Sequence, residues 1–84
     1  MFLEIITPDK KVFEGEVESA KFPGSEGSFQ VLENHAPLIS SLGKGPVVYK
    51  NKQGEHTLEV EGGVVEVLNN RVVLLAESVV TGVA

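Results

Sequence analysis

The chain lacks several residue types on which particular kinds of protein depend. It has no cysteine, which excludes disulfide bonds and thiolate metal sites. It has no tryptophan and a single tyrosine, which argues against the aromatic platforms of sugar-binding modules. Its longest apolar run, residues 72–76, is far shorter than the roughly 20 residues of a membrane-spanning helix. We therefore predict no direct insertion into a membrane.

Basic residues are also scarce. Seven Lys and Arg face twelve Asp and Glu, which leaves a formal net charge of −5. This balance disfavours nucleic acid as a partner, because nucleic-acid binding rests on Lys and Arg neutralising phosphates. It equally disfavours docking on an anionic membrane surface, whereas a basic protein partner is compatible with it. The first residues show no basic segment ahead of a long apolar run, so no secretory signal is predicted.

Valine dominates the apolar residues that are present, and β-branched residues favour strands. Short apolar segments recur every eight to twelve residues or so and are separated by Gly, Pro and Asn, a spacing typical of all-β sandwiches and barrels. No helical period is sustained. We predict one all-β domain, a sandwich or barrel of short strands, over residues 1–84.

The second half of the chain gives the clearest local predictions. Asn69-Asn70 suits a two-residue hairpin turn because Asn tolerates positive φ. Gly62-Gly63 predicts a bulge or a tight bend. The strands expected over residues 64–68 and 71–75 show little polar alternation, which is typical of strands covered on both faces.

Residues 23–45 are rich in glycine and proline and alternate poorly. Pro37 disfavours helix before it, and Leu38, Ile39 and Leu42 are compatible with one irregular turn. Such a segment on a rigid scaffold commonly presents a functional surface.

No catalytic, cofactor or metal site is predicted. The two histidines, His35 and His56, would have to converge with carboxylates to bind a metal. Four serines lie near His35 without a G-x-S-x-G elbow, and residues 24–27 lack the phosphate-binding loop pattern. For His35 two roles stay open: a hydrogen bond to loop backbone, or a contact with a partner.

A set of motifs in fixed order resembles one family over about residues 3–82. They are Thr7-Pro8-Asp9, Val12-Phe13-Glu14-Gly15, Pro23-Gly24-Ser25-Glu26-Gly27, Phe29-Gln30-Val31-Leu32, His35-Ala36-Pro37-Leu38, Leu42 with Gly45, Gly62-Gly63-Val64-Val65-Glu66-Val67, and Val73 to Glu77. The chain resembles the N-terminal β-sandwich domain of the epsilon subunit of F-type ATP synthase, whose mitochondrial counterpart is called delta.

The resemblance implies a flattened sandwich of about ten strands at the foot of the central stalk. One side would pack on the gamma subunit, and the end bearing the loops would rest on the polar loops of the membrane c-ring. The domain would turn with the rotor and couple ion translocation, such as proton transport, to ATP synthesis, without an active site or cofactor. It would sit peripherally on the cytoplasmic face of the bacterial plasma membrane.

By motif position, the candidates for the c-ring contact are Glu26, Ser28 and His35. Family members often carry an acidic residue where this chain has Ser28, so Glu26 is the substitute for a salt bridge. The candidates for the gamma contact are Leu42, Val47, Gly63 and Val64.

Most bacterial members of the family continue into a two-helix hairpin that binds ATP, whereas this sequence ends at Ala84. Met1 directly before the first strand favours a naturally short form over a truncated one, and no ATP-sensing role is assigned to these residues. Three other readings stay open. One is a stand-alone β-sandwich module that binds carbohydrate or peptide. The second is an enzyme with His35 as base, which would require a concave pocket around it. The third is a rotor-like subunit of an assembly other than an ATP synthase.

Overall fold

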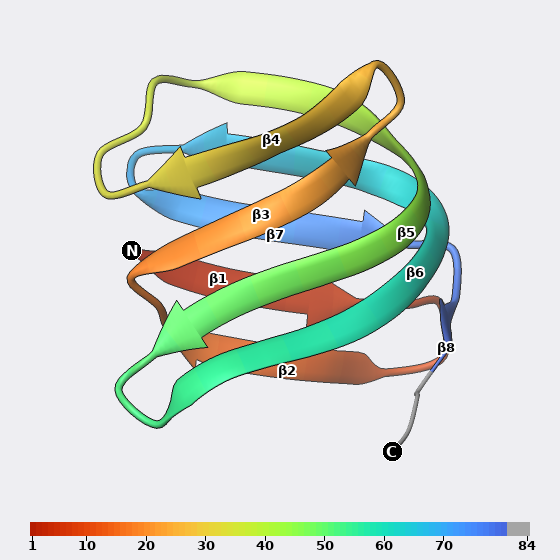
Figure 1. Cartoon of the computed structure of the whole chain (residues 1–84), viewed down its shortest axis with the longest axis horizontal. Coiled ribbons are helices and arrows are strands. Elements are labelled where there is room, and N and C mark those ends of the chain that lie inside the picture. Colours follow the sequence, from red (N-terminus) through yellow and green to blue (C-terminus); the bar gives the residue numbers. More distant parts are fainter. Residues whose placement is uncertain (81–84) are drawn as a thin grey trace.

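The computed structural model describes residues 1–80, which form one hydrogen-bonded sheet folded back on itself into two layers (Figure 1). The predicted all-β sandwich is confirmed; residues 81–84 of the predicted domain lie outside the described residues. Among residues 1–80 no helix has the length and apolarity to cross a membrane. The strands are β1 (Phe2–Ile6), β2 (Lys11–Glu16), β3 (Ser19–Gly24), β4 (Gly27–Leu32), β5 (Leu38–Asn51), β6 (Gly54–Leu68), β7 (Arg71–Ala76) and β8 (Val79–Val80).

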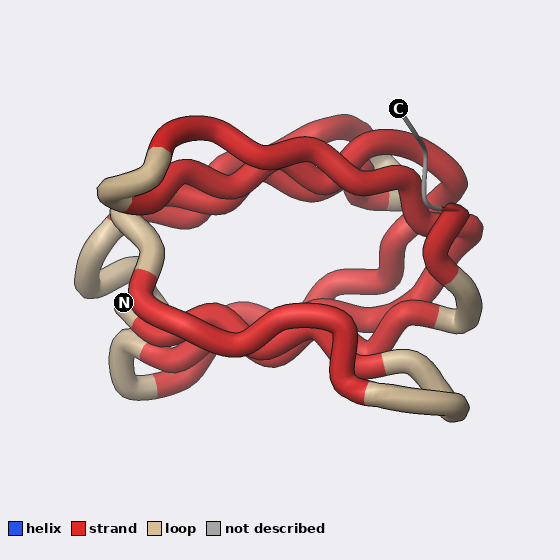
Figure 2. Tube along the Cα trace, turned by 90° about the horizontal axis from the view of Figure 1, so that it is seen from below, coloured by secondary structure: helices blue, strands red, loops and turns tan. Residues whose placement is uncertain are grey.

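The sheet runs in the order β2-β1-β7-β6-β5-β3-β4, and β8 pairs with β6. All pairings are antiparallel except that of β1 with β7. One layer holds β2, β1, β7, the end of β6 and the start of β5; we call it the β1–β7 layer. The other, the β3–β4 layer, holds β4, β3, the end of β5, the start of β6 and β8. Seen from below, the two layers lie face to face (Figure 2).

Two long strands join the layers. β5 has 14 residues and β6 has 15, and each curves around one side of the molecule from one layer into the other (Figure 1). Eight strands are therefore present among residues 1–80 where about ten short ones were expected, since each long strand serves both layers. Gly62 and Gly63 lie in the curve of β6 with φ of 128° and 147°, conformations that favour glycine. The predicted bend is confirmed there, although the pairing of β5 with β6 continues through it without a change of register.

The core lies between the layers and is built from the inward side chains of both. These alternate with outward ones along each strand, as in β7, where Val72 and Leu74 are fully buried. Burying a Val, Leu or Phe side chain stabilises the fold by roughly 1.5–3 kcal/mol each, before the entropy of ordering the chain is subtracted. The fully buried side chains are Leu3, Ile5, Phe22, Val31, Val47, Val60, Val65, Val67, Val72 and Leu74.

The sequence predicted two turns, one at Asn69-Asn70 and one at residues 38–42, and the structure contains the first of them. Asn69 and Asn70 form the turn between β6 and β7 with φ of 52° and 61°, so the predicted hairpin turn is confirmed. The irregular turn expected at residues 38–42 is wrong, because these residues begin β5 and pair with β6 from Leu38–Val67 to Leu42–Gly63. That pairing joins residues more than 20 positions apart, which is why the local sequence does not reveal it.

The outer face of the β1–β7 layer differs from expectation. We predicted that the strands at residues 64–68 and 71–75 are covered on both faces. Within the described part of the chain they are covered on one face only, because Val64 and Leu75 are 42% and 54% exposed. The apolar sequence of these strands is thus not accounted for by the core alone.

Candidate interaction surfaces

The three candidates for the ring contact lie along one edge of the sheet. Glu26 is exposed in the turn between β3 and β4, Ser28 is the second residue of β4, and His35 lies in the loop after β4. β4 ends the strand order, so among residues 1–80 its outer edge has no neighbouring strand. Its six residues span about 20 Å, which separates Glu26 from His35. The structure therefore places the candidates on one edge but at its two ends.

The turn that carries Glu26 is closely packed at its base. Gly24 pairs with Gly27, whose φ is 130°. A Cβ atom on Gly24 would lie 2.5 Å from the carbonyl oxygen of Gly27, so the hairpin closes only with glycine at this position. The backbone N–H of Ser25 donates to the carbonyl oxygen of Ser41 at 3.1 Å, and the two serine hydroxyls are 2.8 Å apart. This turn is thus tied to β5 and does not project freely.

The loop that carries His35 is fixed by backbone hydrogen bonds. The His35 N–H donates to the carbonyl oxygen of Leu32 at 3.1 Å, and its ring Nδ1 lies 2.8 Å from the carbonyl oxygen of Ala36. A carbonyl only accepts, so this contact requires the proton on Nδ1. The half-buried ring thus makes the hydrogen bond to loop backbone that was one of its two expected roles.

A network from three parts of the chain holds the start of the same loop. The side chain of Asn70 accepts from the Asn34 N–H at 2.8 Å and donates to a Glu33 carboxylate oxygen at 2.9 Å. The other Glu33 oxygen accepts from the terminal ammonium of Met1. Asn34 itself has a φ of 62°, a conformation that Asn adopts more readily than most residues. The sequence analysis missed this network because residues 1, 33 and 70 are distant in the chain.

The electrostatics of this network favour both charges. The hydrogen bond from the Met1 ammonium, with that from Asn70, holds the pKa of the exposed Glu33 carboxyl below its usual value. Burial lowers the pKa of the Met1 ammonium, but hydrogen bonds and attraction to Glu33 and Glu16 outweigh burial and raise it overall. Each partner thus favours the charged form of the other.

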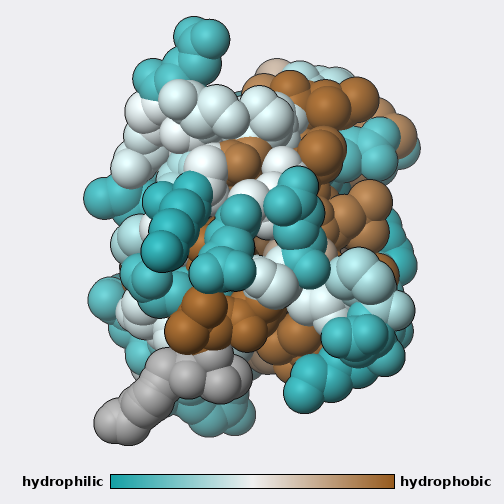
Figure 3. Space-filling model, turned by 90° about the vertical axis from the view of Figure 1, so that its right-hand side faces the viewer, coloured by the Kyte–Doolittle hydropathy of each residue, from teal (hydrophilic) through white to brown (hydrophobic). Residues whose placement is uncertain are grey.

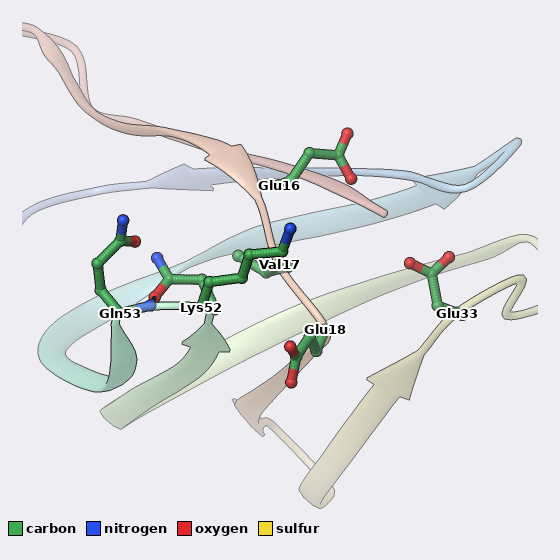
Figure 4. A pocket seen from close by; sticks show the side chains of 7 residues that line it. Glu16, Val17, Glu18, Glu33, Lys52 and Gln53 are labelled. Atoms are coloured by element: carbon green, nitrogen blue, oxygen red, sulfur yellow. Dashed lines mark hydrogen bonds between the residues drawn. The ribbon is translucent and has the colours of Figure 1, made fainter.

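A cleft of about 380 Å³ opens beside this network, with Glu16, Glu18, Glu33 and Lys52 around it. Its three carboxylates point in different directions, and Lys52 reaches across Val17 between them (Figure 4). Among residues 1–80 no three His, Asp or Glu side chains are arranged to hold a metal ion. This cleft therefore gives no arrangement for metal or acid–base chemistry.

The aromatic side chains do not form a binding platform. Phe2 is half-buried, with the Arg71 guanidinium carbon 4.9 Å from its ring centroid. His56 is half-buried: it stacks on Tyr49 with 5.2 Å between ring centroids and contacts the side chain of Asn51 at 3.2 Å. The aromatic residues within or against the core are Phe13, Phe22, Phe29 and Tyr49. This distribution does not favour a sugar-binding module.

The outer side of the β1–β7 layer carries an apolar surface. Ile39 is 71% exposed, and Val64 lies between Ser41 and Leu75 in neighbouring strands, so these side chains share one side of the sheet. In the space-filling view several hydrophobic residues gather toward the upper right, with hydrophilic residues beside them (Figure 3). We call the apolar surface of the β1–β7 layer the apolar face; its apolar residues are Ile6, Ile39, Val64, Val73 and Leu75, and the exposed Glu66 lies between Ile39 and Val73.

The four candidates for the gamma contact occupy different environments. Leu42 and Val47 belong to the core, with 6% and 0% exposure, and so offer no side chain to a partner. Gly63 is half-buried in the bend of β6. Val64 alone among the four is exposed, and it lies on the apolar face. The sequence analysis did not single out its neighbours there, although the run of Val and Leu in β6 and β7 was the available signal.

Comparison with known proteins gives a consistent result. The family described as "ATP synthase, Delta/Epsilon chain, beta-sandwich domain" matches residues 1–82. The ATP synthase epsilon chain of Maridesulfovibrio salexigens is 46% identical over 77 residues, which cover 92% of this chain and 54% of the relative. That of Salinibacter ruber is 37% identical over 86 residues, covering 92% and 58%. The chain thus spans little more than half the length of these relatives.

Two solved structures share the fold. A chain in the mitochondrial ATP synthase of Euglena gracilis, from a structure of OSCP, F1 and the c-ring, matches with a TM-score of 0.86 at 21% identity, covering 93% of this chain and 51% of that one. A chain in the central stalk and c-ring of the Tetrahymena thermophila mitochondrial ATP synthase matches with a TM-score of 0.78 at 18% identity, covering 94% and 64%. Because both identities are below 25%, these matches support a shared fold only.

Proposed function

Because this chain belongs to the β-sandwich family of ATP synthase delta and epsilon chains, we propose that it acts as a non-catalytic subunit of the rotor. In this proposal residues 1–84 form one domain that bridges the gamma subunit and the polar loops of the c-ring. It couples ion translocation to ATP synthesis by turning with both partners. It is peripheral to the membrane, on the cytoplasmic side of a bacterial plasma membrane.

The apolar face is the observation that carries the proposal. A partner that covers Ile39, Val64 and Leu75 would gain roughly 25 cal/mol for each square ångström of apolar surface removed from water. These side chains are adjacent, and partly exposed apolar clusters of this kind mark interaction sites on small domains. A subunit held by a larger partner accounts for them. We assign the gamma contact to this face, with Val64 retained from the original candidates.

The edge of β4 supplies a second, chemically different surface for the ring. It carries Glu26, Ser28 and His35, which are polar and lie next to glycine- and proline-rich turns. Polar loops of a ring offer hydrogen-bond partners and cations to such residues, and a carboxylate such as Glu26 suits Arg or Lys. The edge of β4 and the outer side of the β1–β7 layer are different parts of the sheet, which meet where the turn of Glu26 contacts Ser41, so the domain has surface for both partners.

The test of the gamma contact is co-expression with the gamma subunit encoded with this chain, followed by size-exclusion chromatography. We expect a one-to-one complex for the unmodified chain. Val64→Lys should weaken it at least tenfold, because a charge would be buried in an apolar interface. The matched control is Thr57→Lys, an exposed position of the same strand in the β3–β4 layer. Equal binding by both variants would exclude the apolar face, and no complex at all would reject the gamma partner.

The ring contact needs its own measurement, because a gamma complex could form without it. Purified c-ring in detergent should bind the complex of this chain with gamma, and Glu26→Gln should reduce the affinity. Glu55→Gln, which removes an exposed carboxylate at the start of β6, controls for the change in net charge. A contact by Glu26 should weaken as salt concentration rises, since exposed charges are screened. Unchanged affinity in Glu26→Gln would remove this residue from the contact.

A further inference from the structure

Two serines connect the turn of Glu26 to the edge of the apolar face. Ser25 belongs to the turn between β3 and β4, and Ser41 lies 16 residues later, in β5. They make two contacts, a backbone hydrogen bond of 3.1 Å and the hydroxyl pair at 2.8 Å. We call these contacts the serine pair. Together with the pairing of Gly24 with Leu42, they attach the hairpin of one layer to a strand of the other.

The pairing of the hairpin with β5 is irregular at this position, although β3 and β4 stay paired with each other up to Gly24 and Gly27. β3 pairs with β5 through Lys21 and again through Gly24, with an irregularity between them. Pro23, within that gap, has no N–H to give to the sheet. Beyond Gly24 the turn continues as the end of an edge hairpin, and such turns are among the most mobile parts of a fold. The serine pair is thus the contact that restrains residues 25 and 26 beyond the last pair of the sheet.

Close packing below the turn leaves little room for another arrangement. A Cβ atom on Gly45 would lie 2.9 Å from the Cβ of Pro23, so β5 passes directly against the base of the hairpin. Ser41 is itself fixed, because it pairs with Val64 of β6, which in turn pairs with Leu75 of β7. The serine pair therefore fastens the turn to a strand with a defined place in the apolar face.

We propose that Ser25 and Ser41 are positioning residues, which hold Glu26 in the geometry that the ring contact requires. The inference rests on the proposed function, since the ring is the partner that Glu26 would contact. The hydroxyls need not touch the ring; they restrict the turn, so less conformational entropy is lost when Glu26 binds. The pair also makes the ring-side turn depend on β5, the strand that carries Ile39 on the apolar face.

The test uses the full chain in complex with gamma and measures its affinity for purified c-ring. Ser41→Ala should weaken binding about threefold, the effect of one modest hydrogen bond, while Ser41→Thr keeps the hydroxyl and should restore it. Ser19→Ala, at the opposite end of β3, is the control and should bind normally. A loss of overall stability alone would leave the ring affinity unchanged while the domain stays folded, which circular dichroism of both Ser41 variants checks.

A double-substitution cycle shows whether Ser41 acts through Glu26. If it does, Ser41→Ala should have little further effect once Glu26→Gln is present, because the positioned group has lost its charge. Additive losses would overturn the inference. So would an unchanged exchange rate of the Ser25 amide in Ser41→Ala, measured by hydrogen–deuterium exchange, since the turn would then be held by other contacts.

Failure of the inference can be told apart from failure of the proposed function. If the unmodified chain binds the ring and the Ser41→Ala variant binds equally well, the positioning role is wrong and the rotor function stands. If the unmodified chain binds no ring, the ring contact itself is wrong, and the positioning role is rejected with it.

Discussion

The backbone of Gly63 approaches Leu75 so closely that a Cβ atom on the glycine would lie 2.4 Å from the Leu75 carbonyl oxygen. The contact is between backbone atoms of β6 and β7, so no side-chain movement can relieve it. Gly63 also has a φ of 147°, which other residues rarely adopt. This position lies where β6 curves between the layers, and it is directly followed by Val64 of the apolar face.

Gly63→Val should therefore destabilise the isolated domain by roughly 2–4 kcal/mol, from backbone strain together with displacement of β7. Chemical unfolding followed by circular dichroism measures this loss. The matched control is Gly43→Ala in the facing strand β5, where nothing lies within 4 Å of the added Cβ. That variant should be neutral or slightly more stable. A Gly63→Val variant with unchanged stability would mean that β6 does not need glycine for its bend.

The ion pair between Met1 and Glu33 predicts a dependence of stability on pH. The pKa of Glu33 is lowered from its ordinary value of 4.5, so its contribution exists above that pH and is lost as pH falls through the folded-state value. The pKa of the Met1 ammonium is raised above its ordinary value of 8.0, so its contribution exists below that pH and is lost as pH rises through the folded-state value. The pair should thus stabilise the fold fully between about pH 4.5 and 8.

Glu33→Gln removes the charge that responds in this window. The difference in unfolding free energy between the unmodified chain and Glu33→Gln should be largest from pH 4.5 to 8 and should shrink on either side. Glu18→Gln, which removes another exposed carboxylate at the same cleft, is the control for the change in net charge. A difference that stays constant from pH 3 to 10 would show that the pair makes no charge-dependent contribution.

The two histidines should respond differently to substitution. His35 makes one side-chain contact with a neighbouring carbonyl, so His35→Asp should change stability by less than about 1 kcal/mol while weakening the ring contact. His56 stacks on Tyr49, so His56→Ala should lose about 1 kcal/mol of stability and leave ring binding unchanged. Thermal unfolding and ring affinity, measured on both variants, separate the roles. If His35→Asp unfolds the domain, His35 is structural.

The local sequence predicted what depends on neighbouring residues. The Asn69-Asn70 turn, the glycine bend of β6 and the all-β class follow from conformational preferences that act within a few positions. The length of β5 and β6 was not predictable in this way. Their pairing runs from Leu38–Val67 to Asn51–Gly54, and the long-range contacts at its start are set by the whole sheet.

The curve of β5 explains why two of the gamma candidates, Leu42 and Val47, are buried and not on the surface. In β5 the inward side chains change from even to odd positions across the curve, so both Leu42 and Val47 face the core. Simple alternation from either residue would turn the other outward. Val64 and Leu75 show the reverse error, because they were expected to be covered and are exposed. An apolar sequence alone does not distinguish residues buried in the core from residues that a partner covers.

The serine pair leads to one prediction that involves both surfaces. Ser41 lies beside Val64, so a gamma subunit seated on the apolar face would exclude water from the neighbourhood of the pair. Hydrogen bonds shielded from water are stronger, because water no longer competes and the local dielectric constant falls. Binding of gamma should therefore slow exchange of the Ser25 amide, measured by hydrogen–deuterium exchange with nuclear magnetic resonance.

In Ser41→Ala the slowing of Ser25 amide exchange should be smaller. The Asn34 amide, which donates to Asn70, is the internal control. If gamma binds and the Ser25 amide exchanges at its free rate, the two surfaces act independently.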